Sequence, residues 1–564
     1  MAILAIRSIL VLGLLFAMVF AIATAALYSL DAPLWFALVV AGVVMFLQYL
    51  ISPWIIQLIL KIQWLKPGEM PEFIENALEG LSQRHRMRTP RFGIIPDGNP
   101  NAFTFGHYPG NARIVVTQGL LDMCDEGEIT AVLSHEFGHV AHWDFAVMTI
   151  AATLVMMLYY IYVFGRSSRD RRRNGRRDGS GAALVALGAY IAYIIGEYLV
   201  LFLSRTREYY ADQYAAEVTN NPNGLSSALV KIAYGLARSG AAAGVATSAG
   251  ASQNTEGSYK NSEARLSPMH GFRTMGIFDP KMGASMTLAA AGSYGSKAGG
   301  YDTSVMVKAM EWDLFNPWSW ICELSSSHPL PAKRIRALTK YARARGQYSP
   351  FEFPEHAQES YWDEFFTDLL IYYLPLIGLI IAGAAGFALS SGSLEQGRLL
   401  IIGGAATMGL GAGLLIRVMF MYPSSRFERD TVANLVSQVK VSAIRCVLAE
   451  LEGKVIGRGI PGLYWSEDLV IEDDTGFMVL DYRQPIGVLN FLFGLFRAEQ
   501  FVGQSIRVIG WYRRFPKPFL EVWKIYTPDG AVNTCWTWWL RQVSAVVVLV
   551  LGIGLMLAGL LLAA

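Results

Sequence analysis

The chain has 564 residues, of which 53% are hydrophobic and only 16% are charged, and its formal net charge is +2. This apolar composition indicates a multi-pass membrane protein and excludes an ordinary water-soluble globular protein. The nearly balanced charge gives no reason to expect nucleic-acid binding. Four scattered cysteines without C-x-x-C spacing suggest neither a thiolate metal site nor a disulfide framework.

Seven apolar segments are each long enough to cross a bilayer, which takes about 20 helical residues. The first segment has the alternative of being a signal peptide, because Ala23-Thr24-Ala25 is similar to a cleavage site. Its long apolar run, and the second span that follows closely, favour an uncleaved anchor. The expected spans are residues 8–29, 34–52, 146–165, 182–203, 366–388, 398–421 and 543–563.

Short strands are expected between residues 91 and 117. An apolar run from Arg91 to Ile95 leads into a turn-rich segment, and a second run extends from Asn101 to Phe105. An extended edge strand can bind an extended peptide by strand addition. A purely structural hairpin explains these residues equally well.

The most informative stretch is His135-Glu136-Phe137-Gly138-His139, an H-E-x-x-H run. Residues four apart lie above one another on a helix, so two imidazoles can face one tetrahedral zinc with the glutamate beside the metal's water. Asp125 followed by Glu128 is typical of an N-cap with its capping box, which predicts that helix. The alternative is a buried helix with two satisfied histidines, in which Glu136 would be a costly buried charge.

A third zinc ligand is expected from the segment that ends at Asp212. Glu208 and Asp212 are four residues apart and share a helical face, so Glu208 can reach the metal. Asp212 can then accept the outer N–H of a zinc-bound histidine and fix its tautomer. Asp144, five residues after His139, is a second candidate for that outer role. An ordinary charged helix surface is the alternative interpretation.

Together these motifs resemble those of the HtpX-type membrane zinc metallopeptidases, a family that also includes the CAAX prenyl endopeptidases. The resemblance covers about residues 1–345, and the order of the motifs and the helix hairpin between the second and third also match. The matching pieces are Asn101-Ala102-Phe103 ahead of Ile114 to Leu121, H-E-x-x-H with Asp144, Ser204-Arg205-x-x-Glu208-x-x-Ala211-Asp212, and Ser327-His328-Pro329-Leu330-Pro331-x-x-Arg334-Ile335. A long Gly/Ala/Ser-rich insert after residue 238 and the whole segment after residue 345 depart from the short family members.

The resemblance implies one zinc per chain in a mainly α zincin domain of gluzincin type that bears a small β-sheet. His135, His139 and Glu208 would bind the zinc, and Glu136 would be the catalytic base. Such a site activates water for the hydrolysis of a peptide bond.

The resemblance also implies that the strand at Asn101 and Ala102 holds substrate backbone, and that His328 and Arg334 lie near the site. A histidine and an arginine aimed at the site can steady the oxyanion that forms when water attacks a carbonyl. By residue type alone, His328 before Pro329 is more often a helix-entry residue than a catalyst.

A cytoplasmic N-terminus places the zinc motifs on the cytoplasmic side of the cell (inner or plasma) membrane, which the resemblance also favours. The loops at about 30–33 and 389–397 then carry no Lys or Arg, as the positive-inside rule expects. The loop at 166–181 conflicts with this, because it contains seven arginines. Taken alone, these arginines would place the loop in the cytoplasm and the zinc motifs on the opposite side. A third possibility is that this helix hairpin does not fully cross the membrane. These arginines are expected to tether the loop near anionic lipid.

Residues 422–541 are expected to form a separate β module. Apolar or alternating runs separated by Gly/Asp turns predict five strands, which suggests a small barrel of the OB type. The predicted strands are Val439 to Leu448, Leu469 to Glu472, Gly476 to Asp481, Ser505 to Tyr512 and Phe519 to Tyr526. No basic-aromatic platform stands out, so a protein partner or a membrane surface is expected rather than nucleic acid.

The predicted fold class is therefore a multi-pass α-helical membrane protein with a mainly α zincin catalytic domain and a C-terminal OB-like barrel. The Gly/Ala/Ser-rich residues 239–304 indicate a flexible lid or, more simply, a linker. The expected domains are two transmembrane helices (1–52), a first catalytic part (53–145), a transmembrane hairpin (146–203), a second catalytic part (204–345), a linker with a further hairpin (346–421), the barrel (422–541) and a last span (542–564).

The leading hypothesis is a membrane-embedded zinc endopeptidase that acts on membrane or misfolded proteins, as in quality control. A processing protease for a CAAX-type or other membrane-associated substrate shares all of this chemistry. A non-catalytic scaffold that presents the β module is the third hypothesis, and the complete ligand set argues against it. The expected partners are polypeptide substrates, the bilayer and a protein bound by the β module.

Overall fold

The computed structural model describes residues 2–30, 34–98, 100–172, 180–232, 303–391, 395–458, 467–515 and 517–563. The chain divides into two compact units. The described part of the first unit comes from Met1–Leu236 and Ile321–Glu352, and that of the second from Ala284–Trp320 and Phe353–Ala564. The predicted insert 239–304 lies outside the described residues apart from residues 303 and 304.

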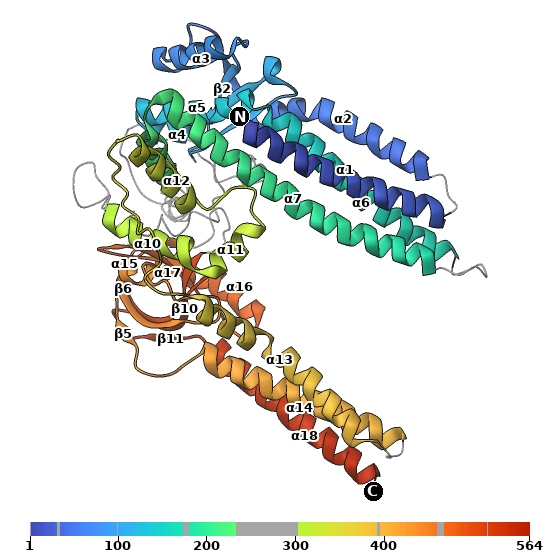
Figure 1. Ribbon diagram of the computed structural model, residues 1–564. Helices are drawn as coiled ribbons and strands as arrows, with labels where there is room; N and C mark the ends of the chain where they lie inside the picture. The colour runs from blue at the N-terminus through green and yellow to red at the C-terminus, as the bar shows by residue number, and fades with distance from the viewer. Residues whose placement is uncertain are drawn as a thin grey trace. The chain divides into compact units, whose positions relative to one another are not determined.

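Three helices of the first unit are long and apolar enough to cross a membrane. These helices lie side by side (Figure 1). They pack on one another through side chains such as Leu15, Val155 and Leu203, which are fully or almost fully buried. The helices are α1 (Ala2–Leu30), α6 (Asp144–Arg172) and α7 (Ser180–Thr219). The predicted span 34–52 falls in α2 (Leu34–Leu60), of which only the shorter stretch Tyr49–Leu60 qualifies as an apolar helix among the described residues, so this crossing stays a prediction.

A four-stranded sheet stands beside the helix that carries the H-E-x-x-H run. The strand order is β1-β2-β4-β3, with β2 and β4 parallel and the other pairs antiparallel. The strands are β1 (Gln63–Leu65), β2 (Arg91–Ile95), β3 (Ala102–Phe105) and β4 (Arg113–Thr117). The predicted strands are therefore present, and β3 forms an edge of the sheet.

Short helices complete the first unit. The buried side chains of α3 include Ile74 and Leu78, and those of α12 include Ile335 and Leu338. In chain order these helices are α3 (Glu72–His85), η1 (Pro109–Asn111), α4 (Gln118–Met123), α5 (Glu126–Ala141) and α12 (Pro331–Ala344). Helix α11 (Pro317–Leu324) crosses the boundary between the units in the sequence.

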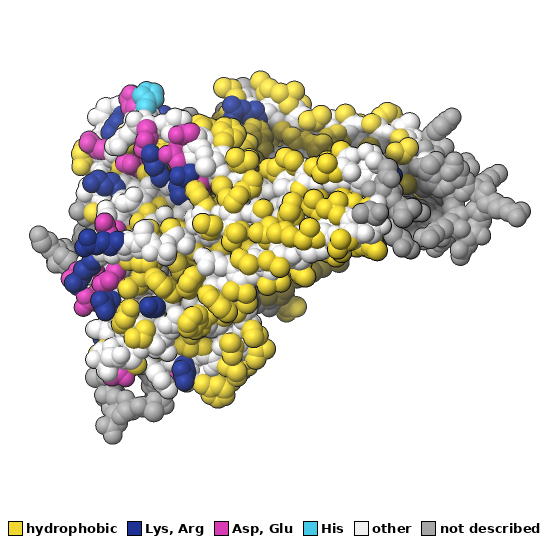
Figure 2. Space-filling model, turned by 90° about the horizontal axis from the view of Figure 1, so that it is seen from below, with side chains coloured by type: hydrophobic (Ala, Val, Ile, Leu, Met, Phe, Trp, Pro, Cys, Tyr) yellow, Lys and Arg dark blue, Asp and Glu magenta, His cyan; other side chains and the backbone are white. Residues whose placement is uncertain are grey.

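Three further candidate membrane helices belong to the second unit: α13 (Trp362–Leu389), α14 (Glu395–Met421) and α18 (Thr537–Ala563). Small residues let α14 and α18 approach closely, since a Cβ at Gly404 would lie only 2.3 Å from the backbone N of Met556. Hydrophobic side chains cover much of the face shown in Figure 2. Six of the seven predicted spans thus coincide with candidate membrane helices among the described residues.

The β module of the second unit is a closed ring of strands. The pairs run β6–β7–β8–β10–β9 and back to β6, and only β8 and β10 are parallel. These strands are β6 (Val447–Arg458), β7 (Leu469–Asp473), β8 (Gly476–Asp481), β9 (Ser505–Arg514) and β10 (Pro518–Tyr526). Around them lie α10 (Thr303–Phe315), β5 (Glu428–Arg429), α15 (Val432–Val436), α16 (Gly487–Phe496), α17 (Ala498–Phe501) and β11 (Val532–Thr534).

The strand predicted from Val439 to Leu448 is wrong over most of its length, because β6 begins only at Val447. The preceding residues lie outside any strand, and two of their carbonyl oxygens accept hydrogen bonds from side chains. Trp312 Nε1 donates to the oxygen of Val441, and Asn316 Nδ2 donates to that of Val439, each at 2.7 Å. These long-range side-chain bonds replace the ladder bonds that the apolar pattern predicts.

Candidate metal centre

The H-E-x-x-H run lies on α5, and the predicted capping box is confirmed. Asp125 Oδ1 accepts from the backbone N–H of Glu128, and Glu128 Oε2 accepts from the backbone N–H of Asp125, both at 2.9 Å. The box begins the helix at Glu126 and so sets its register. His135 and His139 therefore lie one turn apart on the same face.

Gly138 allows α5 and α7 to pack closely behind the site. A Cβ at this position would lie 3.2 Å from the Cα of Ala211 and 3.1 Å from the ring of Tyr214, tighter than most real Cβ contacts. The H-E-x-x-H helix thus lies against the stretch of α7 that carries Glu208.

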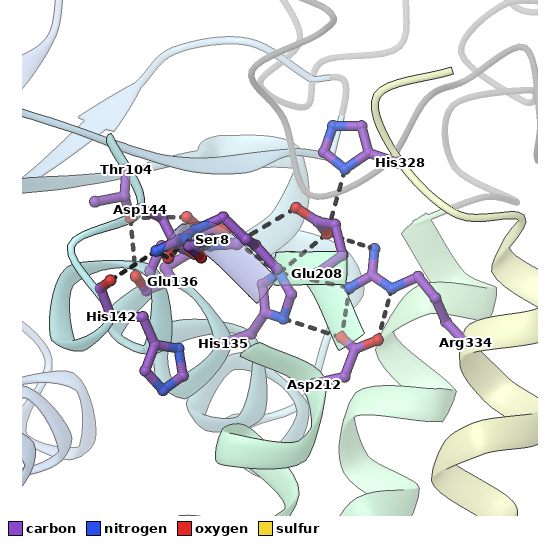
Figure 3. A network of polar contacts seen from close by, with 12 residues as sticks. Ser8, Thr104, His135, Glu136, His142, Asp144, Glu208, Asp212, His328 and Arg334 are labelled. Atoms are coloured by element: carbon purple, nitrogen blue, oxygen red, sulfur yellow. Dashed lines mark hydrogen bonds and ion pairs between the residues drawn. The ribbon is translucent and has the colours of Figure 1, made fainter. Parts of the chain in front are cut away.

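His135, His139 and Glu208 each bring one possible ligand atom within 4.8 Å of the other two. Figure 3 shows His135 and Glu208 side by side in this cluster. The Nε2 atoms of His135 and His139 are 3.2 Å apart. Glu208 Oε2 lies 3.6 Å from His135 Nε2, and its Oε1 lies 3.5 Å from His139 Nε2. Ligands about 2.0–2.1 Å from a tetrahedral zinc would be about 3.4 Å apart, which is close to the spacing of the two imidazoles and of each imidazole from one oxygen of Glu208, so these residues fit a zinc ion.

A carboxylate lies beside the outer nitrogen of each imidazole. His135 Nδ1 lies 3.0 Å from Asp212 Oδ1, and His139 Nδ1 lies 2.5 Å from Asp144 Oδ2. An N–H on each Nδ1 leaves the Nε2 lone pair directed at the metal position. The structure therefore places both predicted outer carboxylates beside the predicted histidines.

The carboxylates also act on the protonation of the metal-free histidines. Burial lowers the pKa of His139, but the hydrogen bond to Asp144 and the charges of Glu208, Asp144 and Glu136 outweigh burial and raise the pKa to about 9. Burial likewise lowers the pKa of His135, and the contacts with Asp212 and Glu208 raise it above its ordinary value. The negative field that favours a proton on these rings equally favours a metal cation.

Arg334 and His328 contact the carboxylates of the site. Arg334 Nε and Nη2 donate to the two oxygens of Asp212 at 2.8 and 2.6 Å, and its Nη1 lies 3.3 Å from Glu208 Oε2. His328 Nδ1 lies 3.2 Å from the same oxygen of Glu208. Burial lowers the pKa of Arg334, but Asp212 and Glu208 outweigh it and raise that pKa, so the guanidinium stays charged. Both predicted neighbours therefore lie at the site.

Glu136 faces the edge strand β3. Thr104 Oγ1 donates to Glu136 Oε2 at 2.7 Å, and only 2% of the Glu136 surface is exposed. Asn101 and Ala102 lie at the start of the same strand, where the N–H of Asn101 donates to Thr117 Oγ1 at 2.8 Å. Sequence reasoning missed Thr104. Side chains alternate between the two faces of a strand, so Thr104 lies on the same face as Ala102 and could have been inferred from it.

A buried arginine that the sequence reasoning also missed connects the site to the first membrane helix. Arg207 donates to Asp144, to the backbone oxygen of His142 and to Ser8 Oγ, the last two at 2.7 Å. Arg207, Asp144 and Ser8 are all buried. The sequence held a signal for each residue. A serine within an apolar helix needs a polar partner, and so does an arginine next to a proposed ligand.

Residues 71–342 match the model of Peptidase family M48. A Protease HtpX homolog of Methanothermobacter thermautotrophicus is 39% identical over 225 residues, which make up 40% of this chain and 82% of that protein. The chain belongs to peptidase family M48. A Protease HtpX homolog of Desulforapulum autotrophicum is 38% identical over 200 residues, 35% of this chain and 64% of that protein. The resemblance predicted from the motifs is thus confirmed.

The crystal structure of S. mikatae Ste24p is also similar, with 24% identity over 40% of this chain and 57% of that one, but its TM-score of 0.28 is too low to support an argument. Family M48 membership and the six candidate membrane helices among the described residues make the chain a multi-pass membrane metallopeptidase. The M48 match ends at residue 342, before the β module.

Proposed function

We propose that this M48 protein is a zinc-dependent endopeptidase of gluzincin type, in which His135, His139 and Glu208 hold one zinc per chain. The observation that carries the proposal is the convergence of these side chains: the two Nε2 atoms are 3.2 Å apart, and each lies within 3.6 Å of an oxygen of Glu208, as around a tetrahedral ion. Zinc bound there lowers the pKa of a water ligand toward about 7 and polarises a peptide carbonyl.

Glu136 is proposed as the general base. Its carboxylate would take the proton of the attacking water and pass it to the leaving amine. Thr104 would orient that carboxylate, because its hydroxyl donates to Oε2 at 2.7 Å. Asp144 and Asp212 would fix the tautomers of His139 and His135.

Positive groups near Glu208 are proposed to stabilise the oxyanion. Arg334 stays charged, and His328 lies 3.2 Å from Glu208. A small movement of either side chain on substrate binding would direct an N–H toward the carbonyl oxygen. Asn101 precedes β3 and Ala102 begins it, and this edge of the sheet would pair with the extended backbone of a substrate.

The test combines metal analysis with one substitution. Purified protein should contain one zinc per chain, and a chelator should stop peptide cleavage until zinc is restored. Glu136→Gln should keep its zinc and lose about 10²–10⁴-fold in kcat, the usual worth of general acid–base catalysis. Protein without zinc, or a zinc-loaded Glu136→Gln variant with wild-type activity, would contradict the proposal.

We propose membrane-protein quality control as the biological role; the relatives' name, Protease HtpX homolog, supports protease activity but not a substrate class. A processing protease for a CAAX-type or other defined substrate is the alternative. Comparison of the proteomes of cells with active and Glu136→Gln protein separates them. Many accumulating membrane proteins indicate quality control, a single unprocessed precursor indicates the alternative, and no change would favour a scaffold.

We propose a cytoplasmic site in the cell membrane and an OB-like fold for the β module within the predicted domain boundaries. The closed ring of strands with one parallel pair supports the OB-like assignment. Labelling of a cysteine placed at Arg166 tests the orientation, because labelling from the cytoplasmic side alone would reverse it.

A further inference from the structure

Helix α16 lies on the β module and presents an apolar surface without charged residues. Its sequence from Gly487 to Phe496 contains a single polar side chain, Asn490. The large hydrophobic side chains of this helix and the residue before it have between 37% and 65% of their surface exposed. They are Ile486, Val488, Leu489, Phe491, Leu492, Leu495 and Phe496. A surface helix of a soluble protein is instead polar on its outer face, so this surface needs a partner.

The opposite face of α16 is firmly attached to the β module. Phe493 stacks on Tyr482 with ring centroids 3.7 Å apart and planes at 12°. Phe493 and Gly494 are buried, and the same aromatic cluster includes Phe501. The exposed side chains therefore belong to a helix held in one orientation.

Hydrogen bonds attach the start of α16 to the segment that enters the membrane helix α18. Asn490 Oδ1 accepts from the backbone N–H of Gln484 at 2.6 Å. The side chain of Gln484 donates to the backbone oxygen of Thr534 at 2.9 Å, and Thr537 Oγ1 donates to the backbone oxygen of Arg483 at 2.7 Å. Thr537 is the first residue of the candidate span Thr537–Ala563. Helix α16 is thus fixed at the level where the chain reaches the bilayer.

The flanking residues are those of a membrane interface. Trp536 and Trp539, at the start of α18, are exposed, and tryptophans gather at the headgroup level of bilayers. Arg483 and Arg497 lie on either side of α16, and both are exposed. Arginines beside an apolar helix can reach lipid phosphates while the apolar side chains enter the acyl region.

We propose that α16 lies in the interface of the bilayer that α18 spans. Its exposed apolar side chains contact the acyl chains, and Arg483 and Arg497 contact the phosphates of that leaflet. A protein partner would also cover an apolar surface, but α16 and the start of α18 are both hydrogen-bonded to the segment Arg483–Gln484, so the lipid that surrounds α18 is the nearest neighbour of α16. The helix then fixes the orientation of the β module on the membrane, independently of the proposed peptidase activity.

The test places a fluorophore in the full chain, reconstituted in vesicles of phosphatidylcholine with a minor fraction of phosphatidylglycerol. Phe491→Cys and Leu495→Cys carry an environment-sensitive label, and Asp474→Cys is the matched control. Asp474 is exposed in the turn between β7 and β8. It lies seven residues before the last residue of β8, after which the chain runs to α16, and this separation corresponds to roughly 20 Å along a strand. The unsubstituted chain gives the background from its four cysteines.

We expect nitroxide-bearing phospholipids to quench the labels at residues 491 and 495 several-fold more strongly than the label at 474, and aqueous iodide to show the opposite order. Equal quenching by iodide at all three positions would overturn the proposal. Labels at 491 and 495 protected from both quenchers would also overturn it, because protein then covers the helix. A label at Val488, 63% exposed, is a second measurement if Phe491→Cys lowers the unfolding temperature.

Discussion

Buried charged groups gather in two regions of this protein, and they are arranged differently. In the β module, Arg513 donates to Glu521 at 3.0 Å and to the backbone oxygen of Ile444 at 2.8 Å, so donors meet acceptors. In the M48 site, two imidazole nitrogens and the carboxylate of Glu208 face one another instead. Metal-ligand groups that converge favour a positive charge between them, either a proton or a metal ion, whereas paired donors and acceptors stabilise a fold without a metal.

The largest expected effect comes from a matched pair of glutamates, Glu208 and Glu521, each with 5% of its surface exposed. Glu208→Ala should lose its zinc and all measurable cleavage. Glu521→Ala should keep zinc and cleavage but lose about 3–5 kcal/mol of stability, because Arg513 is left buried without its carboxylate. Zinc analysis and thermal unfolding check both. Zinc loss from the Glu521 variant would contradict the proposed difference between the metal site and the β module.

The outer carboxylates permit a finer comparison. Asp144→Ala should weaken zinc binding about 10–100-fold, because His139 loses the group that orients its ring. Asp313→Ala removes an equally buried carboxylate, which accepts from Arg514 in the second unit at 2.9 Å, and should leave zinc affinity unchanged. Competition with a chelator measures both affinities. Equal losses would show that Asp144 supports the fold rather than the metal.

The pH dependence of zinc binding tests the electrostatics of the site. The pKa of His139 is raised to about 9 in the metal-free protein, so its ring is protonated at neutral pH. Zinc needs the neutral ring and displaces that proton, so its affinity should fall about tenfold for each pH unit below about 9. Asp144→Ala should weaken this dependence by removing a group that raises the pKa. A zinc affinity that is constant from about pH 6 to about pH 8 would contradict the assignment.

The smallest expected effect is at Ser8. Ser8→Ala deprives Arg207 of one acceptor and should weaken zinc binding only a few-fold, because Asp144 and the oxygen of His142 still hold the guanidinium. Ser8→Thr should restore the affinity. Thr24→Ala is the control: each hydroxyl donates to the backbone oxygen four residues earlier at 2.8 Å, but Thr24 is exposed and Ser8 is buried. Equal zinc affinities of the Ser8→Ala and Thr24→Ala variants would show that the contact between Arg207 and Ser8 does not support zinc binding.

Local patterns predicted the elements of the site well. The capping box at Asp125 and Glu128 and the four-residue spacing of the histidines act within one helix, so the sequence shows them directly. The spacing of Glu208 and Asp212 likewise placed both on one face of α7. The approach of Glu208 and Asp212 to the histidines depends on tertiary packing, and only the order of the motifs along the chain suggested it.

Contacts between distant segments were beyond the sequence. Ser8 and Arg207 are 199 residues apart, and no local pattern pairs them. The false strand before Val447 has the same cause, because side chains from α10 and from Asn316 bind the carbonyl groups of that segment. Apolar, β-branched residues favour a strand only where their backbone groups are not hydrogen-bonded to side chains from distant segments.

Asp144 is the first residue of one candidate membrane helix, and Glu208 and Asp212 lie on another, so the proposed metal site and the candidate membrane helices share the same segments of chain. A fragment without these helices would lose Asp144, Glu208 and Asp212, and with them the proposed metal site. Detergent or nanodisc preparations that retain α1, α6 and α7 are therefore the smallest useful starting point for inhibitor screening.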